Sequence, residues 1–149
     1  EKDLAENRMI VDLLRNDLSR ACAPGSVQVP AFAALESFPG VHHLVSTVKG
    51  RLRDGLTPLD AFFQPFPGGS ITGAPKKRAM EILALLEESP RGPYCGSLGY
   101  WSAGGAMDSS ILIRTLVIEN GVLRLDTGCG ITWASSPDEE LAESLAKAA

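Results

Sequence analysis

Residues 110–126 read Ser110-Ile-Leu-Ile-Arg-Thr-Leu-Val-Ile-Glu-Asn-Gly-Val-Leu-Arg-Leu-Asp126 and set the type of sheet in this chain. Residues 110–118 are rich in β-branched side chains, which predicts one continuous strand. Asn120-Gly121 is a typical two-residue hairpin turn, so residues 122–126 are expected to return beside that strand. Because a two-residue turn pairs its strands antiparallel, the chain is predicted to contain antiparallel sheet.

Helical and strand patterns follow one another along the rest of the chain. Apolar residues recur at helical spacing over residues 2–18. Helix start signals occur at Thr57-Pro58, at Pro75 and at Ser136-Pro137, where Glu139 completes a predicted capping box. Further strands are expected at residues 27–29, 32–38, 41–52 and 95–102. Helices beside antiparallel strands make the predicted fold class α+β.

Composition and charge exclude several classes of protein. The 149 residues are 44% hydrophobic and 21% charged, which is globular composition at the length of one domain. The net charge of −4 argues against a nucleic-acid-binding surface, and no apolar run approaches the roughly 18 residues of a membrane span. Three cysteines without CxxC spacing favour reduced thiols in the cytoplasm over a disulfide framework or a zinc site.

Two acidic pairs lie near the two ends of the chain. Asp3 and Glu6 are three residues apart on the first predicted helix, and Glu140 and Glu143 are three apart on the last. Each pair therefore shares one helix face, and two such faces meeting would form an oxygen-rich Mg²⁺ site. The alternative is that these carboxylates are solvated and interact with the helix dipole, and spacing alone favours that alternative.

Arg114 is the charged residue in the apolar run of residues 110–118. A guanidinium between two apolar strand faces is costly to bury unless an anion accompanies it. A bound carboxylate could fill that role through bidentate pairing. A structural salt bridge, or an edge position that reaches water, would satisfy Arg114 equally well.

A glycine-rich loop, residues 66–75, runs into three consecutive cations, Lys76-Lys77-Arg78. Backbone amides at a helix start attract anions, and cations in a first turn oppose the helix dipole, so a local anion is expected. The loop is not a nucleotide-binding P-loop, because Ala74-Pro75 follows its last glycine where a P-loop has lysine. The alternative is a solvated basic turn.

Three further signals are weak when each is taken alone. The glycines of Gly128-Cys-Gly130 indicate either close backbone approach by a ligand or a bulge. His43 lies in an alternating strand pattern, where a histidine is more often a structural residue than a catalyst. Tyr94 follows Gly92-Pro93 at an expected strand start and by itself indicates nothing specific.

Taken in order, six stretches resemble the motifs of the chorismate-utilising enzymes. They are Ala5-Glu-Asn-Arg-Met-Ile-Val-Asp-Leu-Leu-Arg-Asn-Asp17, His43-Leu-Val-Ser46, Pro67-Gly-Gly-Ser-Ile-Thr-Gly-Ala-Pro-Lys76 with Arg78-Ala-Met-Glu81, Gly96-Ser-Leu-Gly-Tyr100, residues 108–115 and Gly128-Cys-Gly-Ile131. The resemblance implies an antiparallel sandwich with outer helices. Residues 1–149 would be the C-terminal portion of the chorismate-binding catalytic domain, without its N-terminal portion. The ends of the chain, which read as helix without start or stop signals, favour the same view.

The activity that the resemblance implies is Mg²⁺-dependent amination of chorismate by ammonia, giving 4-amino-4-deoxychorismate for p-aminobenzoate and folate synthesis. A separate glutamine amidotransferase subunit would supply the ammonia, and the chain alone is expected to be inactive. Two alternatives stay open. One is conversion of chorismate to anthranilate with release of pyruvate, and the other is a fragment that binds a ligand or partner without catalysis.

The resemblance also implies roles for the acidic pairs. Glu6 and Glu143 would coordinate Mg²⁺ directly, whereas Asp3 and Glu140 would act through water. Family members often carry glutamate at position 3. Lys147 matches a catalytic-site lysine beside the metal carboxylates.

Contacts to the substrate are implied for residues spread along the chain. Arg114 and Tyr94 match the residues that hold a chorismate carboxylate, and His43 matches a catalytic histidine at the departing ring substituent. The complete set of implied substrate-binding residues is Ser70, Tyr94, Arg114, Gly128 and Gly130.

Overall fold

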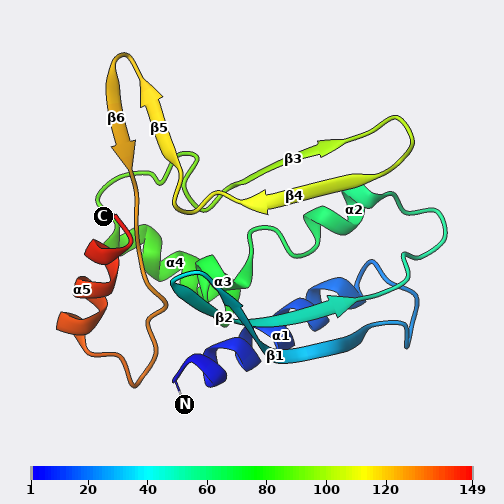
Figure 1. Cartoon of the computed structure of the whole chain (residues 1–149). Helices are drawn as coiled ribbons and strands as arrows, with labels where there is room; N and C mark the ends of the chain where they lie inside the picture. The colour runs from blue at the N-terminus through cyan, green and yellow to red at the C-terminus, as the bar shows by residue number, and fades with distance from the viewer. Residues whose placement is uncertain (1, 149) are drawn as a thin grey trace. The chain divides into compact units, whose positions relative to one another are not determined.

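The computed structural model describes residues 2–148, and of Lys2 only the backbone is described (Figure 1). The chain divides into two compact units. The first unit is Glu1–Lys76 and the second is Lys77–Ala149. Helices accompany antiparallel strand pairs in both units, which confirms the predicted α+β class. None of the helices in the described part of the chain is long and apolar enough to cross a membrane.

The first unit consists of a helix against a hairpin, followed by two short helices. Its elements are α1 (Lys2–Ser19), β1 (Gln28–Phe38), β2 (Val41–Lys49), α2 (Pro58–Phe63) and α3 (Gly69–Thr72). The two short strands predicted before residue 39 form one strand, β1, whose pairing with β2 shifts register twice, between Gln28 and Ala34. Ala33 has a φ of 48°, so the irregular pattern seen in the sequence corresponds to a bulged strand and not to two strands.

Polar side chains fasten α1 to the β1–β2 hairpin. The Asn7 side chain donates to the Leu44 carbonyl at 3.1 Å and accepts from the Ser46 hydroxyl at 2.6 Å. That hydroxyl in turn accepts from the Ala33 amide at 2.8 Å. Asn7 follows Glu6 directly, so this network places the predicted metal ligand on a helix that is tied to the strand of His43.

The helix α2 begins as predicted. The Thr57 side chain accepts from the Asp60 amide, the Thr57 amide donates to the Asp60 carboxylate at 2.7 Å, and Pro58 occupies the first helical position. These hydrogen bonds lower the pKa of Asp60, with the Thr57 hydroxyl as the largest cause. The short helix α3 inside the glycine loop was not predicted, because four residues carry no periodic pattern.

The second unit contains two hairpins and two longer helices. Its elements are α4 (Lys76–Leu86, which starts at the last residue of the first unit), β3 (Ser97–Trp101), β4 (Met107–Ile111), β5 (Leu116–Glu119), β6 (Val122–Leu125) and α5 (Pro137–Ala146). Figure 1 shows β3–β4 and β5–β6 as separate hairpins, both antiparallel. Asn120 and Gly121 form the predicted turn between β5 and β6, with φ of 51° and 77°.

The single strand predicted over residues 110–118 is wrong. The chain leaves β4 after Ile111 and enters β5 at Leu116, and Arg114 between them has a φ of 49°. At Arg114 the left-handed conformation is not accommodated as a bulge, and the chain leaves the sheet between β4 and β5. Strand propensity alone could not show this, because five of the residues around Arg114 are β-branched and favour a strand whatever the φ of Arg114 is.

The start of α5 is only partly as predicted. Pro137 does occupy the first helical turn, after Ser136 in an extended conformation. The predicted capping box is wrong, because the Ser136 side chain makes no cap hydrogen bond. Three acidic residues in the first turn, Asp138, Glu139 and Glu140, favour this helix end through the helix dipole instead.

Buried apolar side chains are few in the described residues, namely Val11, Ala21, Cys22 and Cys95. Part of the packing between elements is made by the backbone of a glycine that lies close to a neighbouring side chain. A Cβ on Gly69 would lie 2.7 Å from Leu13 Cδ1, so α3 packs against α1 through a bare backbone. The three cysteines are free, with Cys22 and Cys95 buried and Cys129 half-buried.

Candidate active site

A cavity of about 140 Å³ in the second unit gathers four of the predicted site residues. Tyr94, Arg114, Gly128 and Lys147 all line it, although they come from four separate segments. The complete lining is Tyr94, Ile113, Arg114, Asp126, Thr127, Gly128 and Lys147. The cavity therefore combines a guanidinium, an ammonium and a phenol with the carboxylate of Asp126.

Tyr94 packs against the backbone of Gly128. A Cβ at residue 128 would lie 2.8 Å from the Tyr94 hydroxyl oxygen, so only glycine permits this approach. Burial, together with the neighbouring Cys95, raises the pKa of Tyr94 to about 12. The phenol is therefore protonated at neutral pH and can donate a hydrogen bond to an anionic ligand.

Arg114 occupies the turn between β4 and β5 and is exposed. The Thr115 hydroxyl donates to the Ile113 carbonyl at 2.9 Å, and the Ile113 amide donates to the Ile111 carbonyl at 3.0 Å, which holds the turn. Of the alternatives left open for Arg114, the structure thus agrees with a position that reaches water and not with burial between apolar strand faces. None of the ion pairs among the described residues includes Arg114, and the Asp126 carboxylate in the same cavity pairs with Arg124 instead.

The loop carrying Gly128 is fastened to one face of α5. The Thr127 and Ser144 hydroxyls lie 2.8 Å apart, and the Cys129 thiol donates to the Glu140 carbonyl at 3.1 Å. Lys147 adds a third contact to this loop, because its Nζ donates to the Gly128 carbonyl at 3.1 Å. Burial raises the pKa of Cys129, so the thiol keeps the proton that it donates.

The second acidic pair lies beside this loop. Glu140 is buried, Glu143 is exposed, and Lys147 Nζ lies 2.6 Å from Glu143 Oε1. One donor atom each from Cys129, Glu140 and Glu143 lies within 4.8 Å of the others. The two carboxylates fit a hard cation such as Mg²⁺, whereas the thiol fits softer metals and is already used as a hydrogen-bond donor.

Four predicted site residues lie in the first unit. Asp3 is exposed and Glu6 is half-buried on α1, so the helix presents both near one face. His43 is exposed on β2, with its ring 5.8 Å from that of Phe38 in an edge arrangement. Ser70 is exposed in α3. Gly130, in the second unit, follows Cys129 but is not part of the cavity lining.

Sequence reasoning missed the residues that support the cavity. Arg91 donates to the Glu87 carboxylate through Nε and Nη2, at 2.6 to 3.0 Å, and its Cζ lies 5.8 Å from the Tyr94 ring centroid. Asp126 is held by Arg124, whose Nη2 also donates to the Pro90 carbonyl at 3.3 Å. The only available signal was proximity in sequence, since Arg91 precedes Tyr94 by three residues and Asp126 precedes Gly128 by two.

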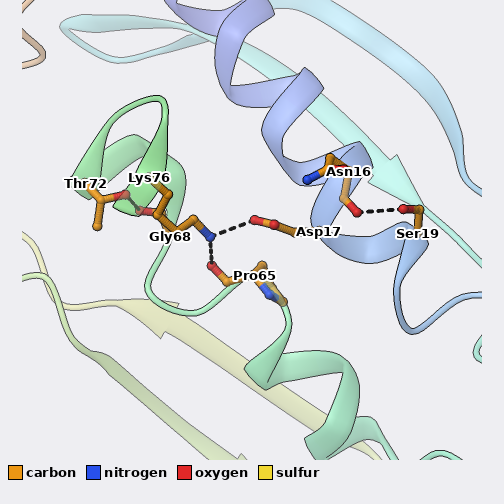
Figure 2. A network of polar contacts seen from close by, with 7 residues as sticks. All are labelled: Asn16, Asp17, Ser19, Pro65, Gly68, Thr72 and Lys76. Carbon is orange, nitrogen blue, oxygen red and sulfur yellow. Dashed lines mark hydrogen bonds and ion pairs between the residues drawn. The ribbon is translucent and has the colours of Figure 1, made fainter. Parts of the chain in front are cut away.

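The cations after the glycine loop find their anions within the protein. Lys76 Nζ pairs with Asp17 Oδ2 at 2.7 Å (Figure 2), and Arg78 pairs with Glu81 at 3.1 Å. The local anion expected from the sequence is thus a carboxylate of the protein for these two residues, whereas Lys77 is exposed.

The second unit combines antiparallel hairpins with helices, and its cavity carries cationic side chains beside the paired carboxylates of a helix. Such a cavity suits the binding of a small carboxylate. Residues 1–149 match the family model for chorismate binding enzyme, and the chain belongs to this family.

Two relatives and one solved structure illustrate the match. The chain is 54% identical over 146 residues to aminodeoxychorismate synthase component 1 of Klebsiella aerogenes, which covers 98% of the chain and 32% of that protein. It is 48% identical over 147 residues to the chloroplastic aminodeoxychorismate synthase of Arabidopsis thaliana, covering 99% of the chain and 16% of the relative. The crystal structure of anthranilate synthase component I from Streptococcus pneumoniae superposes with a TM-score of 0.93 at 45% identity, covering 99% of the chain and 34% of that structure. The chain thus spans between 16% and 34% of the length of these proteins.

Proposed function

We propose that this chain is part of an enzyme that aminates chorismate with ammonia to give 4-amino-4-deoxychorismate. The observation that carries the proposal is the cavity in which Tyr94, Arg114 and Lys147 meet around Gly128. Two relatives with 48% and 54% sequence identity to the chain are named aminodeoxychorismate synthase, which supports this reaction over others in the family. In the reaction a C–N bond to the ring forms, and the ring hydroxyl departs as water.

Binding of a substrate carboxylate is the role proposed for the cavity. Chorismate carries two carboxylates, and a guanidinium without a protein partner can pair with one of them in bidentate geometry. Arg114 offers such a guanidinium, and the protonated hydroxyl of Tyr94 offers a second donor. Backbone amides near Gly128 and Gly130 would add to this set, and Ser70 would contact the substrate from the glycine loop.

Mg²⁺ is the proposed cofactor. Glu6 and Glu143 would hold it directly, with Asp3 and Glu140 acting through water, and carboxylate oxygens are suitable ligands. When bound, the ion would orient the second substrate carboxylate and polarise the departing hydroxyl. Lys147 holds Glu143 and the Gly128 carbonyl together, so it would couple the metal side of the site to the carboxylate side. His43 would assist departure of the ring hydroxyl.

A second subunit is proposed as the source of ammonia. The bacterial relative is named component 1, which implies another component, and a glutamine amidotransferase would release ammonia close to its site of use. A cytoplasmic location is part of the same proposal.

Formation of anthranilate is the second candidate function. The 45% identical structure with a TM-score of 0.93 is an anthranilate synthase component I, so the fold and much of the sequence serve both reactions. That reaction would eliminate pyruvate from the aminated ring, whereas the first candidate retains the side chain.

The two functions are separated by the product. The full-length protein carrying this chain is incubated with chorismate, an ammonium salt and Mg²⁺, and products are identified by chromatography with mass detection. Aminodeoxychorismate supports the first candidate, fluorescent anthranilate supports the second, and a lack of both products contradicts both. Arg114→Met is expected to abolish turnover and Arg78→Met to leave it unchanged, because Arg78 pairs with Glu81 on the surface of α4. Turnover by residues 1–149 alone would contradict the expectation that the chain is inactive by itself.

A further inference from the structure

One ammonium group closes the glycine loop. Lys76 Nζ donates to the Pro65 carbonyl at 2.8 Å and pairs with Asp17 Oδ2 at 2.7 Å (Figure 2). Pro65 immediately precedes residues 66–75 and Lys76 immediately follows them. Both ends of the loop are therefore held by the same group, and that group is held by α1.

The ion pair between Asp17 and Lys76 is shielded from water. The exposed fractions of the two side chains are 7% and 20%, so salt screens their attraction less than it does at a surface. Asp17 lies in the last turn of α1, where the helix dipole disfavours a carboxylate. A cation at this position removes that penalty, and loss of either partner leaves a charge poorly compensated.

The loop also rests on the same face of α1. Leu13 lies four residues before Asp17, and its Cδ1 would be 2.7 Å from a Cβ on Gly69. Within the loop the Thr72 hydroxyl donates to the Gly68 carbonyl at 2.9 Å, which shapes the single turn of α3 around Ser70. The loop is thus packed on Leu13 at its centre and tied to Asp17 at its two ends.

We propose that Asp17 and Lys76 are positioning residues that hold the glycine loop, and with it Ser70, in the shape that receives the substrate. The inference rests on the proposed function, in which Ser70 contacts chorismate. The ion pair acts through the loop backbone, so neither Asp17 nor Lys76 needs to touch the substrate. Loss of the ion pair is expected to weaken substrate binding more than it slows the chemical step.

The test compares Asp17→Asn and Lys76→Met with the control Lys77→Met in the full-length protein. Lys77 is the same residue type one position later, but it is exposed. Hydrogen exchange of the amides in residues 66–75 is measured by mass spectrometry, together with kcat and KM for chorismate. The exchange rate and KM are each expected to rise about tenfold in the two ion-pair variants, with kcat within about twofold of wild type. Lys77→Met is expected to match wild type in all three quantities.

A double variant, Asp17→Asn with Lys76→Met, protects the test against misfolding. It leaves no uncompensated charge in the buried site, so it is expected to fold even where Lys76→Met does not, and to show the same faster exchange and raised KM. Unchanged exchange over residues 66–75 overturns the proposal, and so does faster exchange with unchanged KM. A wild-type protein that does not turn over chorismate overturns the proposed function and the substrate role of Ser70. The exchange rates would still decide whether the pair holds the loop.

Discussion

The hydroxyl of Tyr94 lies so close to Gly128 that a Cβ at residue 128 would come within 2.8 Å of the phenol oxygen. This contact joins two walls of the cavity that are 34 residues apart in sequence. It also makes the position of the phenol depend on the absence of a side chain at residue 128.

Gly128→Ala is expected to displace the Tyr94 ring, because the new methyl and the phenol oxygen cannot occupy their positions at that distance. We expect kcat/KM for chorismate to fall about 10- to 100-fold, measured by steady-state kinetics. Gly104→Ala is the control, since its Cβ would meet only the Ser102 hydroxyl, at 3.8 Å. The double variant Tyr94→Phe with Gly128→Ala lacks the clashing oxygen, so its melting temperature should be higher than that of Gly128→Ala alone. If Gly128→Ala leaves kcat/KM unchanged, this contact does not shape the site.

Tyr94 should titrate about two pH units above an ordinary tyrosine, because burial raises its pKa to about 12. Since the folded-state pKa exceeds the unfolded one, Tyr94 contributes stability that is fully present below pH ~10 and is lost as pH rises toward 12. The measurement is the ultraviolet titration of wild type minus that of Tyr94→Phe. A difference curve with its midpoint near pH 10 would show that the phenol is not shielded.

Glu87→Gln is expected to loosen Arg91 and, through it, the ring of Tyr94. The Arg91 guanidinium lowers the pKa of Glu87, so the charged pair contributes stability above the ordinary glutamate pKa that is lost as pH falls. We expect kcat/KM for chorismate to fall about 3- to 10-fold at neutral pH. Glu88→Gln is the control, because this neighbouring glutamate is in none of the ion pairs among the described residues. Equal effects of the two substitutions would argue against support of Tyr94 by Arg91.

Glu143→Gln is expected to raise the Mg²⁺ concentration for half-maximal activity at least about tenfold, because an amide oxygen is a weaker ligand for a hard cation than a carboxylate. The measurement is a Mg²⁺ titration of chorismate turnover in the full-length protein, with chelator abolishing activity. Glu139→Gln serves as the control, since Glu139 is exposed in the first turn of the same helix but lies outside the cluster of Cys129, Glu140 and Glu143. An unchanged titration for Glu143→Gln would remove this residue from the metal site.

Local rules account for the elements that sequence reasoning predicted correctly. The spacing of apolar residues predicts α1, the Thr57-Pro58 signal with Asp60 predicts α2, and Asn120-Gly121 predicts the β5–β6 turn. In each case the deciding contacts join residues at most a few positions apart. The same rules failed at Arg114 and at Ser136, where the backbone conformation and the missing cap bond depend on the surroundings.

By itself the sequence determined the α+β class, the antiparallel hairpins and the pairing of carboxylates on single helix faces, because helical and strand periodicities act over a few residues. Only the tertiary structure decided that Tyr94, Arg114, Gly128 and Lys147 share one cavity and that Lys76 pairs with Asp17 across 59 residues. Packing of distant segments selects such contacts, and no local spacing encodes which distant partner a buried charge will meet.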